Sequence, residues 1–68
     1  MKDNSVSKLE YLEARQKYEI KIIKIMKKQL GHDPYLMKND LYLLNHQREL
    51  EKIEKEIIIE KDKLINNL

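Results

Sequence analysis

Large aliphatic residues recur at helical spacing in two long segments of the chain, on either side of a single break. The C-terminal segment repeats leucine or isoleucine every seven residues, and Ile53, Ile58, Ile65 and Leu68 widen the resulting seam. The five heptad positions are Leu36, Leu43, Leu50, Ile57 and Leu64. Such a repeat is typical of a helix in a coiled coil or a helical bundle.

The N-terminal segment carries two apolar stripes instead of one. At about 100° per residue, the two stripes together cover more than half of a helix circumference. A lone two-helix hairpin can bury only one face of each helix, so the second stripe needs another partner. We therefore expect a homo-oligomer, most simply a dimer that forms a four-helix bundle. The first stripe comprises Leu9, Leu12, Ile20, Ile23, Met26 and Leu30, and the second comprises Tyr11, Ala14, Tyr18, Ile22 and Ile25.

The break between the two segments holds the only glycine and the only proline of the chain, Gly31 and Pro34. Glycine just past one helix and proline in the first turn of the next are common stop and start signals. Asp33 is placed to cap the second helix. The pattern predicts an all-α antiparallel helical hairpin and one domain over residues 1–68, with a helix over about 6–30, a turn at 31–34 and a helix over about 35–66.

The size and composition of the chain limit the classes of protein to which it can belong. A chain of 68 residues buries only a small core, and chains of this size usually gain stability from a binding partner, a disulfide or a metal ion. It contains no cysteine, which excludes disulfides and thiolate sites and fits a reducing compartment. The first residues lack the apolar run of a secretory signal, and the longest apolar run, Ile57-Ile58-Ile59, is too short to span a bilayer. We expect a cytoplasmic protein that does not bind a membrane.

Polar residues interrupt both apolar faces near the middle of the predicted hairpin. If Leu30 faces Leu36 across the turn, Glu19 lies near His46 and Gln47, and Arg15 shares the same arc of the first helix. The simpler interpretation of Arg15, Glu19, His46 and Gln47 is a polar layer that fixes register and partner choice. The alternative is a histidine–carboxylate pair that acts on a ligand or responds to pH.

A row of lysines follows the first helix at spacings of four, three and four residues: Lys17, Lys21, Lys24 and Lys28. This row suits nucleic acid phosphates, although it lacks interleaved aromatic residues for base stacking. A solvated helix face is the more common meaning of such a row.

Tyr11, Tyr18, Ile22 and Ile25 belong to the second stripe of the N-terminal segment. We interpret them as a protein interface, filled by a second copy or by another protein.

No set of residues indicates a catalytic site, a metal site or a cofactor. The two histidines, His32 and His46, lie fourteen residues apart, without the spacing of a known metal motif. There is no glycine-rich phosphate loop and no nucleophile motif. We expect no metal and no cofactor.

The turn Gly31-His32-Asp33-Pro34 resembles the Gly-to-Pro turn of the short aspartyl-phosphate phosphatases of the bacterial sporulation phosphorelay, which are also antiparallel helical hairpins. The family hallmark is an S-Q-E-L-D run early in the second helix. The corresponding stretch, Asp40-Leu41-Tyr42-Leu43-Leu44, keeps only the leucine, and Gln47-Arg48-Glu49-Leu50-Glu51 echoes the run later. The resemblance implies dephosphorylation of a response regulator.

Three functions are therefore consistent with the sequence. The leading one is a small non-enzymatic regulatory or adaptor protein that dimerises and binds another, unidentified protein. The first alternative is a nucleic-acid-binding hairpin, and the second is a response-regulator phosphatase.

Overall fold

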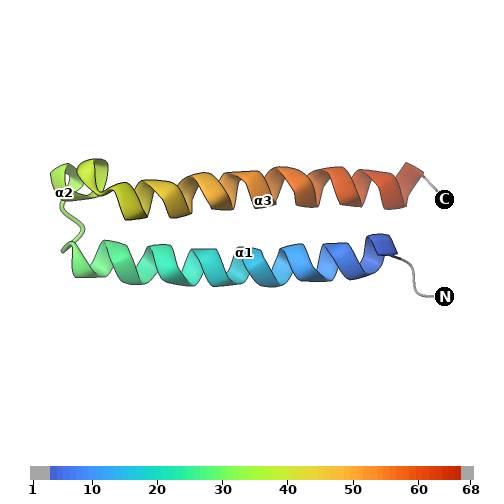
Figure 1. The fold of residues 1–68 in the computed structure, drawn as a ribbon, viewed down its shortest axis with the longest axis horizontal. Coiled ribbons are helices and arrows are strands. Elements are labelled where there is room, and N and C mark those ends of the chain that lie inside the picture. Colours follow the sequence, from blue (N-terminus) through green and yellow to red (C-terminus); the bar gives the residue numbers. More distant parts are fainter. Residues whose placement is uncertain (1–3, 67–68) are drawn as a thin grey trace.

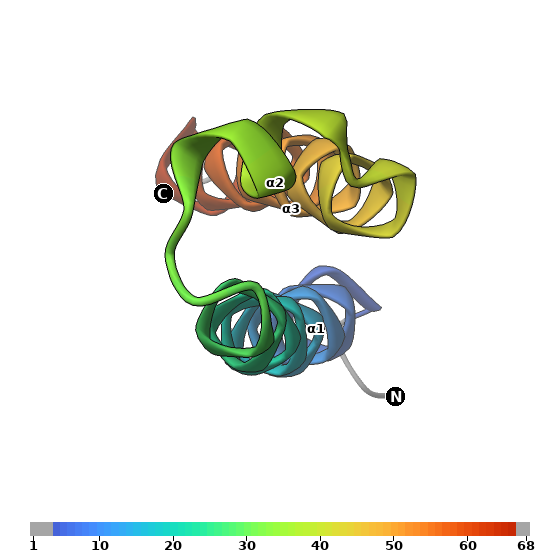
Figure 2. The ribbon, with the colours of Figure 1, turned by 90° about the vertical axis from the view of Figure 1, so that its left-hand side faces the viewer.

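Two long antiparallel helices form the molecule, as seen in a computed structural model that describes residues 4–66, with side chains from residue 8 onward (Figure 1). Helix α1 spans Asn4–Gln29, the short helix α2 spans Pro34–Asn39, and α3 spans Leu41–Asn66. The long helices lie side by side as one layer, with Cα extents of 47 × 17 × 14 Å (Figure 2). The prediction of an all-α hairpin is confirmed, because residues 4–66 contain helices and no strand.

The turn after α1 is a Schellman motif. Gly31 and His32 both have positive φ angles, 66° and 55°. The N–H of His32 donates to the carbonyl of Lys27 at 2.9 Å, and the N–H of Gly31 donates to that of Lys28 at 3.0 Å. This pair of bonds satisfies carbonyl groups that the end of a helix leaves without a partner. A left-handed conformation at Gly31 explains why the single glycine stands there.

Asp33 and Pro34 begin the second arm as the sequence predicts. One carboxylate oxygen of Asp33 accepts hydrogen bonds from the backbone N–H groups of Tyr35, at 2.9 Å, and Leu36, at 3.4 Å. Pro34 occupies the first turn, where its missing N–H costs no hydrogen bond. These contacts turn the chain back along α1.

The single helix predicted over about 35–66 is wrong at Asp40, which interrupts it. The backbone of Asp40 is extended, with φ −86° and ψ 111°. Its carboxylate accepts a hydrogen bond from the N–H of Leu43 at 2.9 Å, and the side chain of Asn39 donates to the carbonyl of Tyr35 at 2.8 Å. Aspartate and asparagine side chains compete in this way with the backbone bonds of a continuing helix. The arm is therefore two helices, α2 and α3.

The core is a thin seam between α1 and α3. Its buried apolar side chains are Leu12, Ile23, Leu43, Ile53 and Ile57. Four positions assigned to the core stripes are exposed instead, Ile20, Leu36, Ile58 and Ile65, and Leu68 lies outside the described residues. Leu36 is 46% exposed because the break at Asp40 turns α2 out of the seam, and Ile20 is exposed at the flank of α1.

Candidate functional site

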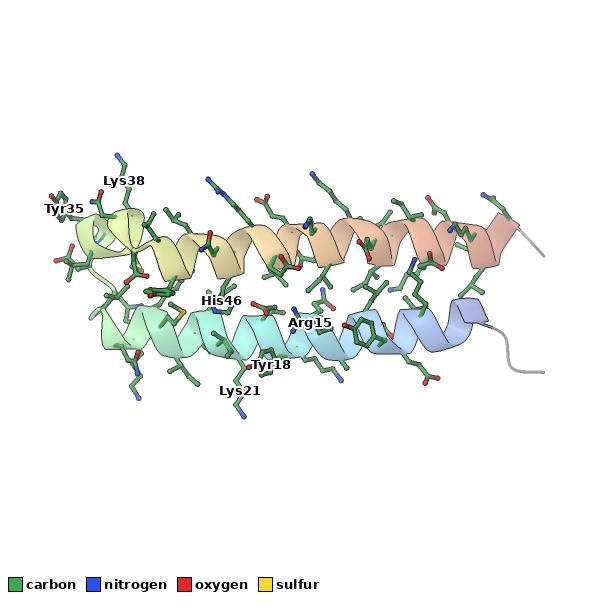
Figure 3. The ribbon with its side chains drawn as sticks, viewed as in Figure 1. Arg15, Tyr18, Lys21, Tyr35, Lys38 and His46 are labelled. Atoms are coloured by element: carbon green, nitrogen blue, oxygen red, sulfur yellow. The ribbon has the colours of Figure 1, made fainter. Side chains whose placement is uncertain are left out.

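A buried carboxylate lies at the centre of the hairpin. Glu19, on α1, is buried, with 3% of its side chain exposed. Its Oε2 is 2.6 Å from Nδ1 of His46 on α3, and its Oε1 is 3.3 Å from Nη2 of Arg15, one helical turn earlier on α1. Figure 3 shows Arg15 and His46 between the two long helices. The structure thus brings three members of the predicted polar layer together.

The geometry of this cluster satisfies the buried carboxylate from both helices. An ionised Glu19 can only accept a hydrogen bond, so in that state Nδ1 of His46 is the donor. A carboxylate removed from water is costly unless it is paired and hydrogen-bonded, and here both oxygens have a partner. Gln47, the fourth predicted member, is half-buried, and no hydrogen bond joins it to the other three in the described part of the chain. The arrangement suits a layer that fixes the register of α1 against α3.

Arg15 connects the buried cluster to the surface. Its guanidinium carbon lies 5.8 Å from the centroid of the Tyr18 ring, within the range of a cation–π contact. One side of the guanidinium therefore faces Glu19 and another faces the exposed ring. Tyr18 and Lys21 point to the side of α1 that is turned away from α3 (Figure 3).

The four residues predicted as a protein interface, together with Ala14, form a largely exposed stripe on α1, which we call the tyrosine stripe: Tyr11, Ala14, Tyr18, Ile22 and Ile25. Tyr11 is 63% exposed, Tyr18 54% and Ile25 49%, while Ile22 is half-buried. The stripe runs along a flank of α1 that α3 leaves uncovered. Exposed aromatic and branched side chains in a continuous row are typical of a protein contact surface.

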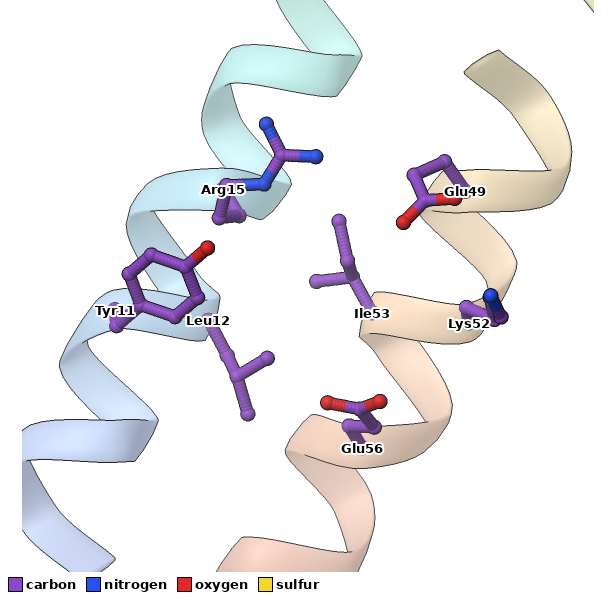
Figure 4. A pocket seen from close by; sticks show the side chains of 7 residues that line it. All are labelled: Tyr11, Leu12, Arg15, Glu49, Lys52, Ile53 and Glu56. Atoms are coloured by element: carbon purple, nitrogen blue, oxygen red, sulfur yellow. The ribbon is translucent and has the colours of Figure 1, made fainter. Parts of the chain in front are cut away.

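A shallow depression lies beside the tyrosine stripe, between α1 and α3 (Figure 4). Residues of α1 give it an aromatic and a cationic side chain, and residues of α3 give it two glutamates and a lysine. This mixed-charge border next to an apolar row matches the polar rim and apolar centre of protein interfaces. The lining residues are Tyr11, Leu12, Arg15, Glu49, Lys52, Ile53 and Glu56.

A second buried carboxylate, Glu60 on α3, is absent from the sequence-based prediction. Its Oε1 lies 3.3 Å from Nζ of Lys8 on α1 and 3.2 Å from Nζ of Lys63. Burial alone raises the pKa of Glu60, but hydrogen bonds and charges from Lys63 and Lys8 outweigh it, so the net pKa lies below its ordinary value. The heptad spacing could have indicated this burial, because Glu60 stands seven residues after the buried Ile53 and three after Ile57, on the same seam.

The predicted lysine row is exposed along its whole length. Lys17, Lys21, Lys24 and Lys28 all lie on the outer side of α1. The one acidic residue among positions 14–29 is Glu19, which is buried in the central cluster. None of the exposed side chains in this stretch is therefore acidic.

The described residues contain no group of three histidine, aspartate or glutamate side chains placed to hold a metal ion. Within the same part of the chain, no helix has the length and apolar character needed to cross a membrane.

Comparison of the chain with protein-family models, curated proteins and solved structures finds no match. The resemblance to sporulation phosphatases stays a prediction. In the echo of their hallmark run, Gln47 and Glu49 are half-buried and Glu51 is exposed. Any assignment of function depends on the residues of this chain alone.

Proposed function

We propose that this chain is a small non-enzymatic regulatory or adaptor protein that acts through helix-mediated protein–protein contacts. The observation that carries the proposal is the tyrosine stripe, in which Tyr11, Tyr18 and Ile25 are about half exposed or more on one flank of α1. Exposed aromatic side chains in a continuous row, with Arg15 beside them, have the composition of binding hot spots.

The amount of exposed surface supports a partner. The accessible surface of the hairpin is 5797 Å². A compact monomer of 8.3 kDa has about 4,600 Å², so the hairpin exposes roughly 1,200 Å² more than its mass requires. A stable protein interface covers about 800 Å² on each partner. One interface of this size on a single face of the hairpin removes about two thirds of the excess.

A second copy is the first partner that we propose, in a four-helix bundle. The seam between α1 and α3 contains few fully buried apolar side chains, and chains of this size commonly gain stability by oligomerisation. Symmetric dimers are the commonest oligomers, and a bundle of four antiparallel helices buries a second flank of each α1.

Sedimentation equilibrium at micromolar concentration tests the self-association. The wild-type protein is expected to show a mass well above the 8.3 kDa of one chain. Tyr18→Lys places a charge in the tyrosine stripe and is expected to shift the protein to a monomer, while Lys17→Gln, on the adjacent exposed position, keeps the dimer. A monomeric wild-type protein with unchanged helix content contradicts the proposed dimer.

The adaptor role is tested by capture of partners from the native host, identified by mass spectrometry. A partner that binds wild type and Lys17→Gln but not Ile25→Lys supports the tyrosine stripe as the contact surface. Equal capture by all three proteins contradicts it.

The lysine row supports a second candidate function, the binding of nucleic acid. All four lysines are exposed, and the burial of Glu19 leaves no acidic side chain exposed between positions 14 and 29. Each phosphate contact makes binding steeply weaker as salt rises. A fluorescent duplex that binds at low salt, and is lost in a variant with all four lysines changed to glutamine, supports this function.

A further inference from the structure

The tyrosine stripe is symmetric about Tyr18. Tyr11 and Ala14 lie seven and four residues before it, and Ile22 and Ile25 lie four and seven residues after it. Two α1 helices packed antiparallel and centred on Tyr18 place Tyr11 of one copy against Ile25 of the other. The same operation places Ala14 against Ile22, and Tyr18 against itself.

The side chains that this symmetry pairs are complementary in size. Ala14 is the smallest residue of the stripe and meets the branched Ile22, so the two helices can approach without overpacking. Tyr11 and Ile25, both exposed in the hairpin, gain an apolar partner. An interface related by a two-fold axis has to be self-complementary in this way, because the same patch serves both subunits.

The charges along the hairpin also favour the antiparallel arrangement. The half next to the turn, residues 17–48, holds seven basic and three acidic residues, a net charge of +4. The open half, residues 4–16 and 49–66, holds six basic and eight acidic residues, a net charge of −2. The Glu19–His46 contact places the boundary between the halves at the height of Tyr18. Antiparallel copies therefore set each basic half over an acidic half, whereas parallel copies set the two basic halves together.

The buried cluster explains how arginine is tolerated beside the two-fold axis. Arg15 flanks Tyr18, so two copies of its guanidinium come near the axis of such a dimer. Each one is ion-paired with Glu19 of its own chain at 3.3 Å, which offsets its charge before the copies meet.

From these observations we infer that the second copy docks with its α1 antiparallel on the tyrosine stripe, with the two-fold axis at Tyr18. This inference deepens the proposed self-association and rests on it, since it specifies the partner, the face and the direction of packing.

Single-cysteine variants test the geometry directly, because the chain has no cysteine of its own. A disulfide forms only where two Cα atoms come within about 7 Å. Under mild oxidation Tyr18→Cys is expected to give a covalent dimer. Tyr11→Cys and Ile25→Cys are each expected to stay uncrosslinked alone and to form a mixed dimer when combined. Lys17→Cys, off the stripe, is the matched control and is expected to stay uncrosslinked.

Other outcomes overturn the inference and separate it from the proposed function. Self-crosslinking at positions 11, 18 and 25 alike indicates parallel α1 helices. A dimer by sedimentation with no crosslink on the stripe indicates another face. Either result leaves the proposed self-association standing, whereas a monomer by sedimentation removes both. Circular dichroism of each reduced variant, compared with wild type, establishes that the hairpin is intact.

Discussion

Nδ1 of His46 and Oε2 of Glu19 lie 2.6 Å apart and join α3 to α1 at the middle of the hairpin. The two residues are 27 positions apart in the chain, so their contact reports the register of the whole fold. A hydrogen bond to a buried carboxylate is directional, whereas aliphatic contacts on either side tolerate a shift of one turn. The pair therefore specifies which residues of the seam face one another.

Glu19→Ala is expected to destabilise the hairpin by about 1–3 kcal/mol, because Arg15 and His46 lose their shared acceptor. Both partners keep about a third of their side chains exposed and can turn toward water, which limits the loss. Urea unfolding of Glu19→Ala, His46→Ala and the double variant gives the coupling energy. Coupling near zero means that the contact contributes nothing to stability.

Replacing Glu19 and His46 together with leucine is expected to restore most of that stability, since well-packed apolar residues often match a buried polar pair. The interface between α1 and α3 then has no directional hydrogen bond at its centre to hold the register. Hydrogen exchange is expected to show weaker protection in the middle of α1 and α3 than in wild type. Unchanged protection contradicts a role of the pair in register.

The acid sensitivity of the fold is expected to depend on Glu60, whose pKa is lowered by Lys63 and Lys8. A carboxyl with a folded pKa below its unfolded value, about 4.3, stabilises the fold above that pH. The contribution is lost as the pH falls through the folded pKa. The stability gap between wild type and Glu60→Gln should therefore be largest near neutral pH and should shrink below about pH 4.3.

Urea unfolding of both proteins at a series of pH values measures this gap. Glu51→Gln, an exposed glutamate on the same helix, is the matched control for loss of one carboxylate. A gap between wild type and Glu60→Gln that stays constant through the acid range would falsify the link between Glu60 and acid stability.

Gly31→Ala is expected to cost about 1–2 kcal/mol, the usual penalty for a side chain in the left-handed region. A Cβ atom there meets no atom within 4 Å, so the cost comes from the backbone conformation and not from a clash. Thermal unfolding measures it. The adjacent His32 already has a positive φ of 55°, and His32→Gly is the matched control, with an expected change of opposite sign or none. An unchanged melting temperature in Gly31→Ala contradicts the Schellman turn.

Asp40→Ala is expected to destabilise the hairpin by about 1 kcal/mol through loss of the cap on α3. The carboxylate of Asp40 accepts from Leu43, which is fully buried at the first turn of that helix. Asp40→Ser keeps an acceptor and should recover most of the loss. If Asp40→Ala and Asp40→Ser are equally destabilised, the cap is not the cause.

Part of the candidate site was predictable because a short turn between two antiparallel helices sets which of their residues lie opposite one another. Placing Leu30 opposite Leu36 brought Glu19 near His46, and the same spacing put Tyr11, Tyr18 and Ile25 on one stripe. Glu60 was missed because a charged residue on an apolar seam is usually assigned to solvent. Its ion pairs are with Lys8, 52 positions earlier on the other helix, and with Lys63.

The sequence by itself determined the two long helices and the turn between them, because their signals are local. Heptad aliphatics, a glycine suited to positive φ, and an aspartate followed by proline act on neighbouring residues. Only the tertiary structure decided which apolar residues are buried. The break at Asp40 turns Leu36 away from the seam, and α3 covers a single flank of α1, which leaves Tyr11 and Tyr18 in solvent. Burial depends on what a residue faces across the hairpin, and no local pattern contains that information.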